Sequence, residues 1–267
     1  MTNLAVQLNP VVEQVENKNI ISFDYIKMLR EQEQEKPAKQ TKVNNRVIGE
    51  STEVYAFKNM DEIKSMIDVF DKHIEEAENN DLRKIASRNK LLFLVGINIG
   101  IRASDLRELK WSFFFYEDSN GELKFNDYYS LQPKKQRKQK KFVKLHFNQT
   151  VRQAINNYIK DYPIENLDDY LFYSRVGDEP IEVNTLRRVI KSAAKEAGIM
   201  QNIGSHSLRK TWGFWCWHES LDKNKALVIL QQAFNHSSTQ TTMKYIGLMD
   251  EEISDMYNSI NLGLDFI

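Results

Sequence analysis

His206 and Arg209 lie three residues apart in the segment Ser205-His-Ser-Leu-Arg-Lys210, which is typical of a helix start with Ser205 as its cap. Residues at this spacing share one helix face, so an imidazole and a guanidinium point the same way where the helix dipole favours an anion. Arginine supplies a planar fork of donors, and histidine exchanges a proton near neutral pH. The pair suits a phosphate, although a chance neighbourhood of surface side chains has the same pattern.

A second grouping runs from Asn235-His-Ser-Ser to Tyr245. Ser238 can cap a short helix that carries Tyr245 at its far end, which would place the phenol across a small cleft from His236. A phenol is a weak nucleophile at its ordinary pKa, and neighbouring arginines make its oxyanion easier to form. The alternative is that Tyr245 is an ordinary half-buried aromatic residue.

The segment Gly100-Ile-Arg-Ala-Ser-Asp105 places a second guanidinium, that of Arg102, at the start of a short helix after a glycine break. Asp105 follows three residues later and can hold that arginine in a fixed orientation. The alternative is a helix-terminal ion pair that contributes little.

A dense basic segment lies near the middle of a chain whose 37 Lys and Arg residues balance 37 Asp and Glu residues. With no net charge, binding to a polyanion has to come from such local clustering. A lysine at a hairpin tip can also enter a groove or give a proton to a leaving oxygen; a merely basic loop is the alternative. Its cations are Lys134, Lys135, Arg137, Lys138, Lys140, Lys141 and Lys144.

Composition excludes several classes of protein. The 267 residues are 41% hydrophobic, which is enough for a sizeable core and excludes global disorder. The single cysteine excludes a disulfide framework and a thiolate-rich metal site. The longest apolar run, Leu91 to Ile101, is about half the length that spans a bilayer. Because no secretory signal is visible either, we expect an intracellular protein without a membrane anchor.

Hydrophobic periodicity predicts a mainly α fold with one small antiparallel β-sheet, an α+β class. A basic linker over residues 36–46 follows the first predicted helix. The sheet is expected from runs at 111–116, 123–131 and 140–147, with a turn at Asp118-Ser-Asn-Gly121. The predicted helices span 22–35, 59–78, 81–99, 103–110, 148–160, 183–196, 206–219, 222–234, 239–244 and 251–261.

The order and spacing of these groups resemble the tyrosine recombinase (phage integrase) family. The blocks that carry the resemblance are Ile99-Gly-Ile-Arg-Ala-Ser-Asp-Leu-Arg-Glu-Leu-Lys-Trp111, Ser205-His-Ser-Leu-Arg-Lys-Thr-Trp212 and Phe234-Asn-His-Ser-Ser-Thr-Gln-Thr-Thr-Met-Lys-Tyr245. The resemblance implies a catalytic domain at 55–250. A short N-terminal segment and linker at 1–54 would be a reduced or absent core-binding domain. The tail at 251–267 would be exchanged between protomers or packed in cis.

The resemblance also implies residue roles. Tyr245 would attack a DNA phosphodiester, His206 would act as its general base, and His236 would hydrogen-bond the phosphate. Arg102 and Arg209 would stabilise the transition state, with Asp105 in support. Lys135 would be the general acid, with Lys134 and then Lys138 as rivals because the hairpin is displaced from the usual spacing. No metal and no cofactor is required. The residues expected to bind DNA are Lys134, Arg137, Lys138, Lys140, Lys141 and Lys210.

The function implied is that of a site-specific DNA recombinase or integrase of a phage, transposon or other integrative element. Its partner would be double-stranded DNA, bound at two sites by a homo-tetramer that is monomeric or dimeric off DNA, with accessory DNA-bending or excision factors. The protein would be located in the cytoplasm, either associated with a prokaryotic nucleoid or as a viral protein. Two alternatives stay open, a non-catalytic DNA-binding regulator of the same fold and a type IB topoisomerase-like enzyme. Asn235 departs from the glycine that commonly precedes the second histidine.

Overall fold

The computed structural model describes residues 53–134, 142–176 and 178–260. The chain divides into Met1–Ser51 and Thr52–Ile267, and every described residue belongs to the second unit. The predicted helix at 22–35 and the linker at 36–46 therefore lie outside the described residues. So do the tail beyond Ile260 and the hairpin residues Lys135, Arg137, Lys138, Lys140 and Lys141.

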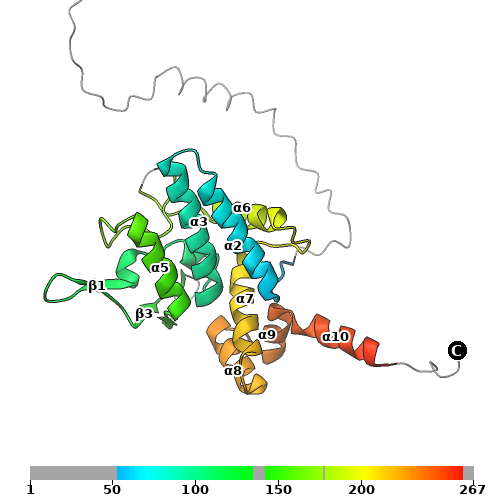
Figure 1. Ribbon diagram of the computed structural model, residues 1–267. Helices are drawn as coiled ribbons and strands as arrows, with labels where there is room; N and C mark the ends of the chain where they lie inside the picture. Colours follow the sequence, from blue (N-terminus) through cyan, green and yellow to red (C-terminus); the bar gives the residue numbers. More distant parts are fainter. Residues whose placement is uncertain (1–52, 135–141, 177, 261–267) are drawn as a thin grey trace, which may run out of the picture. The chain divides into compact units, whose positions relative to one another are not determined.

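Three helices form one side of the molecule: α2 (Met60–Glu75), α3 (Asn80–Ile99) and α5 (Gln149–Asp161) (Figure 1). Each begins where an asparagine side chain accepts a backbone N–H of the first turn, at Asn59, Asn79 and Asn148. Their apolar stripes bury aromatic side chains against one another; the ring centroids of Phe70 and Phe93 are 5.7 Å apart. The predicted helices at 59–78, 81–99 and 148–160 are confirmed.

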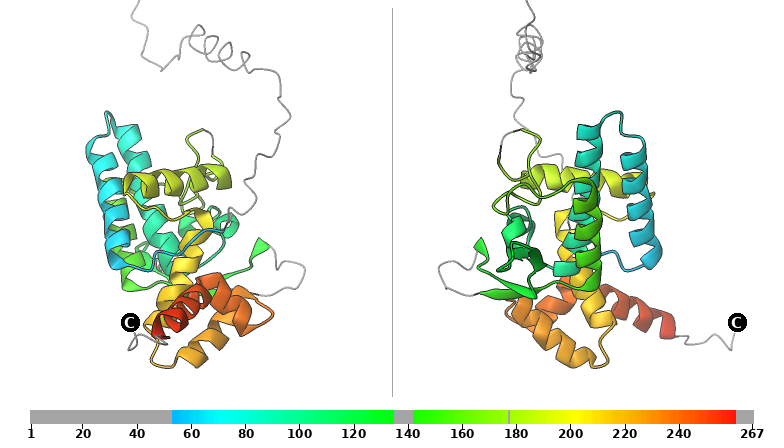
Figure 2. Two further views of the ribbon diagram at one scale, coloured as in Figure 1. Left: turned by 90° about the vertical axis from the view of Figure 1, so that its right-hand side faces the viewer. Right: turned by 60° about the vertical axis from the view of Figure 1, so that its left-hand side comes forward.

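Helix α7 (Ser205–His218) joins two apolar clusters. Its Leu208 belongs to the main core, which α6 (Val183–Glu196) also covers, whereas its Phe214 belongs to a smaller cluster. That smaller cluster is completed by α8 (Lys223–Phe234), α9 (Thr239–Ile246) and the start of α10 (Leu248–Ser259), which extends away from the other helices (Figure 2). Within the described part of the chain, no helix is both long and apolar enough to cross a membrane.

The β-structure differs from the expected single sheet. Strands β1 (Phe115–Glu117) and β2 (Leu123–Phe125) form one antiparallel pair, and β3 (Tyr128–Leu131) and β4 (Val143–His146) form another. The predicted strand at 123–131 is divided at residues 126–127, where pairing with β1 ends and pairing with β4 begins; the Asn126 N–H, which donates to Phe114 O at 2.8 Å, is the last bond of the first pair. The turn at Asp118–Gly121 is present, with Asp118 accepting the N–H groups of Asn120 and Glu122.

The segment after Arg102 also differs. Helix α4 (Ala103–Leu106) is shorter than the predicted 103–110. It ends early because Leu109 O accepts Leu171 N at 2.8 Å, so the next residues pair with a distant segment. The expected strand from 111 begins instead as a 3₁₀ turn, η1 (Trp111–Phe113). Tertiary pairing has therefore overridden local propensity in this stretch.

Candidate active site

The two predicted phosphate-binding arginines meet at the carboxyl end of α8. Arg102 is the N-cap residue of α4, and its Nη2 donates to Phe234 O at 3.4 Å. Arg209, on α7, donates from Nη2 to Ala233 O, also at 3.4 Å. The last carbonyls of a helix have no partners within it and carry its negative partial charge. They therefore hold two like-charged side chains close together at one place.

Arg209 is the more tightly fixed of the two. It is 7% exposed, its Nη1 donates to Gly100 O at 2.5 Å, and its guanidinium lies 4.5 Å from the centroid of the Phe234 ring. Burial, and to a smaller extent Arg102, lower the pKa of Arg209 to about 10, while Tyr245 and Asp105 oppose the change. Arg209 is therefore still charged at neutral pH, in a site where its charge is poorly screened.

Tyr245 lies in the last turn of α9, whose start is capped by Ser238 as predicted. Burial raises the pKa of the Tyr245 phenol, while Arg209 and Arg102 lower it, Arg209 also by hydrogen bonding. Beneath the ring, the Lys210 ammonium lies 5.2 Å from the Tyr245 centroid. The hydroxyl is thus within the field of both guanidinium groups, where a developing phenolate is stabilised.

His236 lies against Tyr245, as the sequence predicts. The two ring centroids are 5.1 Å apart at an interplanar angle of 72°, and His236 Nδ1 is 3.0 Å from Thr242 Oγ1. Burial, and then the charges of Arg209 and Arg102, lower the pKa of His236, so the imidazole is neutral at pH 7. Asn235 has a φ of 57° and forms the left-handed cap of α8. Asparagine tolerates this conformation, so it can replace the usual glycine here.

The base of the basic hairpin is attached to the Arg102 segment. The Lys134 N–H donates to Asp105 Oδ1 at 3.0 Å, and the Lys134 ammonium pairs with Glu108. Asp105 is 4% exposed and thus connects the segment of one predicted catalytic arginine to the chain leading into the hairpin. The neighbouring Lys135 lies outside the described residues, so its role as general acid stays a prediction.

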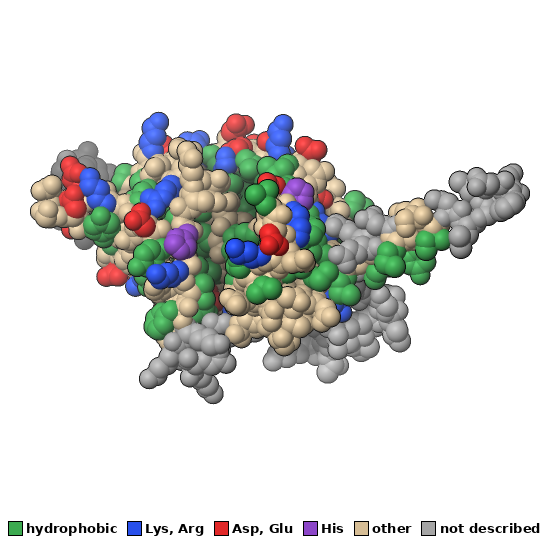
Figure 3. Space-filling view, turned by 90° about the horizontal axis from the view of Figure 1, so that it is seen from below, with side chains coloured by type: hydrophobic (Ala, Val, Ile, Leu, Met, Phe, Trp, Pro, Cys, Tyr) green, Lys and Arg blue, Asp and Glu red, His purple; other side chains and the backbone are tan. Residues whose placement is uncertain are grey.

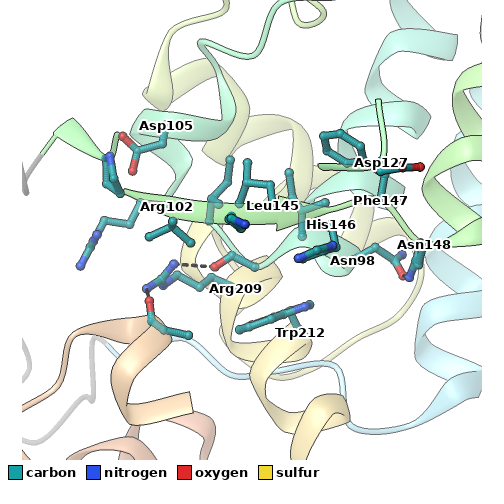
Figure 4. Close-up of a pocket in the computed structure, with 17 residues that line it drawn as sticks. Asn98, Arg102, Asp105, Asp127, Leu145, His146, Phe147, Asn148, Arg209 and Trp212 are labelled. Carbon is teal, nitrogen blue, oxygen red and sulfur yellow. Dashed lines mark hydrogen bonds between the residues drawn. The ribbon is translucent and has the colours of Figure 1, made fainter. Parts of the chain in front are cut away.

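A cavity of about 430 Å³ adjoins the two arginines (Figure 4). Arg102 and Arg209 lie at one end, and it extends along β4 past His146 to the side-chain amides of Asn98 and Asn148. On the face of the molecule seen from below, Lys, Arg and His side chains lie around a hollow, together with Asp and Glu side chains (Figure 3). The cavity can therefore receive a polyanion whose phosphate meets the arginines.

The structure brings Arg102, Arg209, His236 and Tyr245 together and places two other predicted residues differently. His206 has an exposed side chain in the first turn of α7, and the N-cap of that helix is Gly204, not Ser205. Lys210 is 6% exposed and pairs with Glu53 at 2.6 Å, so it does not lie on an open DNA-binding face. The roles of both residues in DNA chemistry stay predictions.

Sequence reasoning missed three contributors to the site: Glu53, Glu108 and Thr242. Thr242 is polar but fully buried. Its spacing of six residues after His236 indicates a contact between the two only when α9 is known to fold back on that histidine. Glu53 and Glu108 are recognisable only from the lysines with which they pair. In the described ranges, no group of three or more His, Cys, Asp or Glu side chains is arranged to hold a metal ion.

The chain is similar in sequence to known proteins. Residues 59–252 match the phage integrase family. "Probable integrase/recombinase YoeC" of Bacillus subtilis (strain 168) is 31% identical over 184 residues, which are 69% of this chain and 90% of that protein. "Tyrosine recombinase XerH" of Campylobacter jejuni is 27% identical over 177 residues, 65% of this chain but 45% of that protein.

Two solved structures are similar in fold. That of XerA recombinase has a TM-score of 0.53 at 21% identity, and that of XerH bound to a palindromic difH substrate has 0.51 at 20% identity. Each match covers 78% of this chain, and 65% and 55%, respectively, of those longer chains.

Proposed function

We propose that this chain, which belongs to the phage integrase family of tyrosine recombinases, cuts and rejoins DNA through Tyr245. Members of that family are DNA strand-exchange enzymes. The observation that supports this most directly is that the Tyr245 phenol lies in the field of Arg209 and Arg102. A purely structural tyrosine would have no need of two guanidinium groups held together beside it.

In the proposed reaction, the Tyr245 oxygen attacks phosphorus as its proton passes to His206. The bond to the 5′-oxygen breaks, and that oxygen takes a proton from Lys135, which leaves a 3′-phosphotyrosyl link and a free 5′-hydroxyl. Arg102 and Arg209 bind the non-bridging oxygens and stabilise the charge that grows on them. Attack by a 5′-hydroxyl of another strand reverses these steps and completes strand exchange.

The proposed partner is double-stranded DNA, and the proposed context is a mobile element whose ends are recombined site-specifically. The proposed assembly is a homo-tetramer on two DNA sites. Its support is α10, whose Ile253, Met256 and Tyr257 side chains are exposed while the helix extends away from the body (Figure 1). An apolar helix face that stays exposed among the described residues favours docking onto another protomer.

A nicked suicide duplex, made from repeats that flank the gene, tests the proposed nucleophile. The wild type should form a covalent protein–DNA adduct that resists denaturation, and Tyr245→Phe should form none while binding the duplex equally well. An adduct that persists in Tyr245→Phe would refute the assignment. A wild type that binds specifically but never forms an adduct would favour the regulator, and relaxation of supercoiled DNA without site preference would favour the topoisomerase-like enzyme.

The two arginines have their own test. Arg102→Ala and Arg209→Ala should lower the rate of adduct formation by at least about 100-fold, as expected when a preorganised donor is removed from a transition state. Duplex affinity should change far less. Because Arg209 is buried, thermal unfolding of both variants has to accompany the assay. A loss of affinity as large as the loss of rate would make these residues binding groups.

A further inference from the structure

Thr242 is the polar side chain of α9 that lies deepest in the site. It is fully buried, and its hydroxyl oxygen is 3.0 Å from His236 Nδ1. The same oxygen is 3.4 Å from Ser238 O, the carbonyl one helical turn earlier. A buried threonine in a helix ordinarily bonds to that carbonyl, so its approach to a histidine nitrogen is a separate feature.

The proton inventory allows two arrangements. A neutral imidazole has one N–H, and the threonine hydroxyl has one proton to donate. If Thr242 donates to Nδ1, the ring proton of His236 is on Nε2, which can then donate to a phosphate. If Thr242 donates to Ser238 O instead, Nδ1 carries the proton and Nε2 can only accept.

The distances favour the first arrangement. At 3.0 Å the contact with Nδ1 is of ordinary hydrogen-bond length, whereas the 3.4 Å contact with Ser238 O is beyond the usual range. The histidine ring packs against two aromatic rings that also contact each other, with centroids 5.2 Å away for Phe234 and 5.1 Å away for Tyr245. The charged or titratable groups around it are Arg209, Arg102 and Tyr245; burial first, and then the two cations, lower the pKa of His236 and favour its neutral form.

We propose that Thr242 is a positioning residue that donates its hydroxyl proton to His236 Nδ1 and so fixes the tautomer in which Nε2 carries the ring proton. Its consequence for catalysis rests on the proposed function, since only a phosphate-binding histidine needs a donor at Nε2. The tautomer itself does not depend on that function. A hydrogen-bond partner on one ring nitrogen generally determines the protonation of the other.

The direct test is long-range ¹H–¹⁵N NMR on the full chain labelled with ¹⁵N-histidine. The chain has 5 histidines, and His236→Asn identifies the signal of interest. We expect the wild type to show the Nε2–H tautomer and Thr242→Val, which exchanges the hydroxyl for a methyl group, to show a mixture. A wild type in the Nδ1–H form would overturn the proposal whether or not any variant folds.

Adduct formation on the suicide duplex supplies the functional arm. Thr242→Val should react on the order of tenfold more slowly than the wild type, the effect of losing one oriented hydrogen bond to a catalytic histidine. Thr242→Ser, which keeps the hydroxyl, should restore most of the rate, and Thr241→Val on the exposed neighbour should react normally. A Thr242→Val variant that keeps both the tautomer and the rate would overturn the proposal. Failure of the wild type to form any adduct would instead refute the proposed function and leave the tautomer result standing.

Discussion

The ammonium group of Lys210 lies 5.2 Å from the centroid of the Tyr245 ring and is paired with Glu53 Oε1 at 2.6 Å. A lysine in a basic motif beside a proposed catalytic arginine is expected to contact DNA, but this one is buried against the ring of the proposed nucleophile. The segment before α2 supplies its counter-ion, and Lys58 of the same segment donates to Gly247 O at 2.7 Å. The segment that enters the domain thus contacts Gly247, at the carboxyl end of α9, directly and the Tyr245 ring through Lys210.

The burial of Lys210 predicts that it does not contribute to the salt dependence of DNA binding. Lys210→Met should leave the slope of log affinity against log salt unchanged, while Lys138→Gln in the hairpin should reduce it by about 0.9, the value for one neutralised phosphate. Fluorescence anisotropy over a salt series measures both. A reduced slope in Lys210→Met would mean that the pair with Glu53 opens when DNA binds.

The same ion pair makes an asymmetric prediction about stability. Glu53→Ala leaves a buried ammonium without its carboxylate and should lower the free energy of unfolding by about 1 kcal/mol, a modest value because Glu53 is half exposed. Lys210→Met replaces the charge by an apolar chain against the Tyr245 ring and should be nearly neutral. Urea unfolding of the two variants compares them. Equal losses of unfolding free energy in the two variants would show that the pair stabilises the fold through charge attraction alone, with no added cost for an unpaired buried ammonium.

Gly100 is predicted to be irreplaceable for two separate reasons. Its φ is 63°, and a Cβ there would lie 2.2 Å from ring atoms of Trp212, while its carbonyl accepts the Arg209 guanidinium. Gly100→Ala should therefore lower the free energy of unfolding by about 2–4 kcal/mol, the sum of backbone strain and overpacking. Gly198, with a φ of 73° and open space around it, is the matched control. Gly198→Ala should show the strain alone, about 1 kcal/mol. Similar losses at both sites would exclude the contact with Trp212 as a cause.

The identity of the general acid can be decided with a leaving group that needs no proton. Replacing the bridging 5′-oxygen of the substrate by sulfur gives a thiolate, and a thiol has an ordinary pKa of about 8.5. Lys135→Ala should cut the oxygen substrate at least about 100-fold more slowly and recover on the sulfur substrate. Lys134 pairs with Glu108, so Lys134→Ala should affect both substrates alike. If the cleavage rate recovered on the sulfur substrate in Lys134→Ala but not in Lys135→Ala, the general acid would be Lys134 instead.

The lowered pKa of His236 predicts a pH dependence of stability. Because burial, Arg209 and Arg102 hold it below its ordinary value of 6.5, the unfolded chain binds this proton at higher pH than the folded chain. The unfolding free energy therefore falls as the pH falls below 6.5, and it does not depend on this group well above that value. His236→Asn should show a shallower decline below pH 6.5 in urea unfolding at a series of pH values. Parallel curves of unfolding free energy against pH for the wild type and His236→Asn would mean that His236 has the same pKa in the folded and unfolded chains.

The sequence by itself determined where most helices begin and end and which motifs could form the site. Asn59, Ser238 and Gly100 act as cap residues where local patterns predict them. These signals are reliable because a cap satisfies backbone groups within one turn of itself, and distant residues contribute little. The motif spacing likewise predicted that His236 and Tyr245 would lie together, since a single turn and one short helix separate them.

Only the tertiary structure decided which polar side chains are buried and with what they pair. Lys210 meets Glu53 across 157 positions of sequence, and Arg209 meets the Gly100 carbonyl across 109. The division of the β-structure into two sheets likewise depends on which strand each segment pairs with, β2 with β1 and β3 with β4. Such contacts follow from the packing of separate segments around a shared core, where burial makes each polar group require a partner. No periodicity within one segment contains that information, so the partners of Lys210 and Arg209 become visible only when the chain is folded.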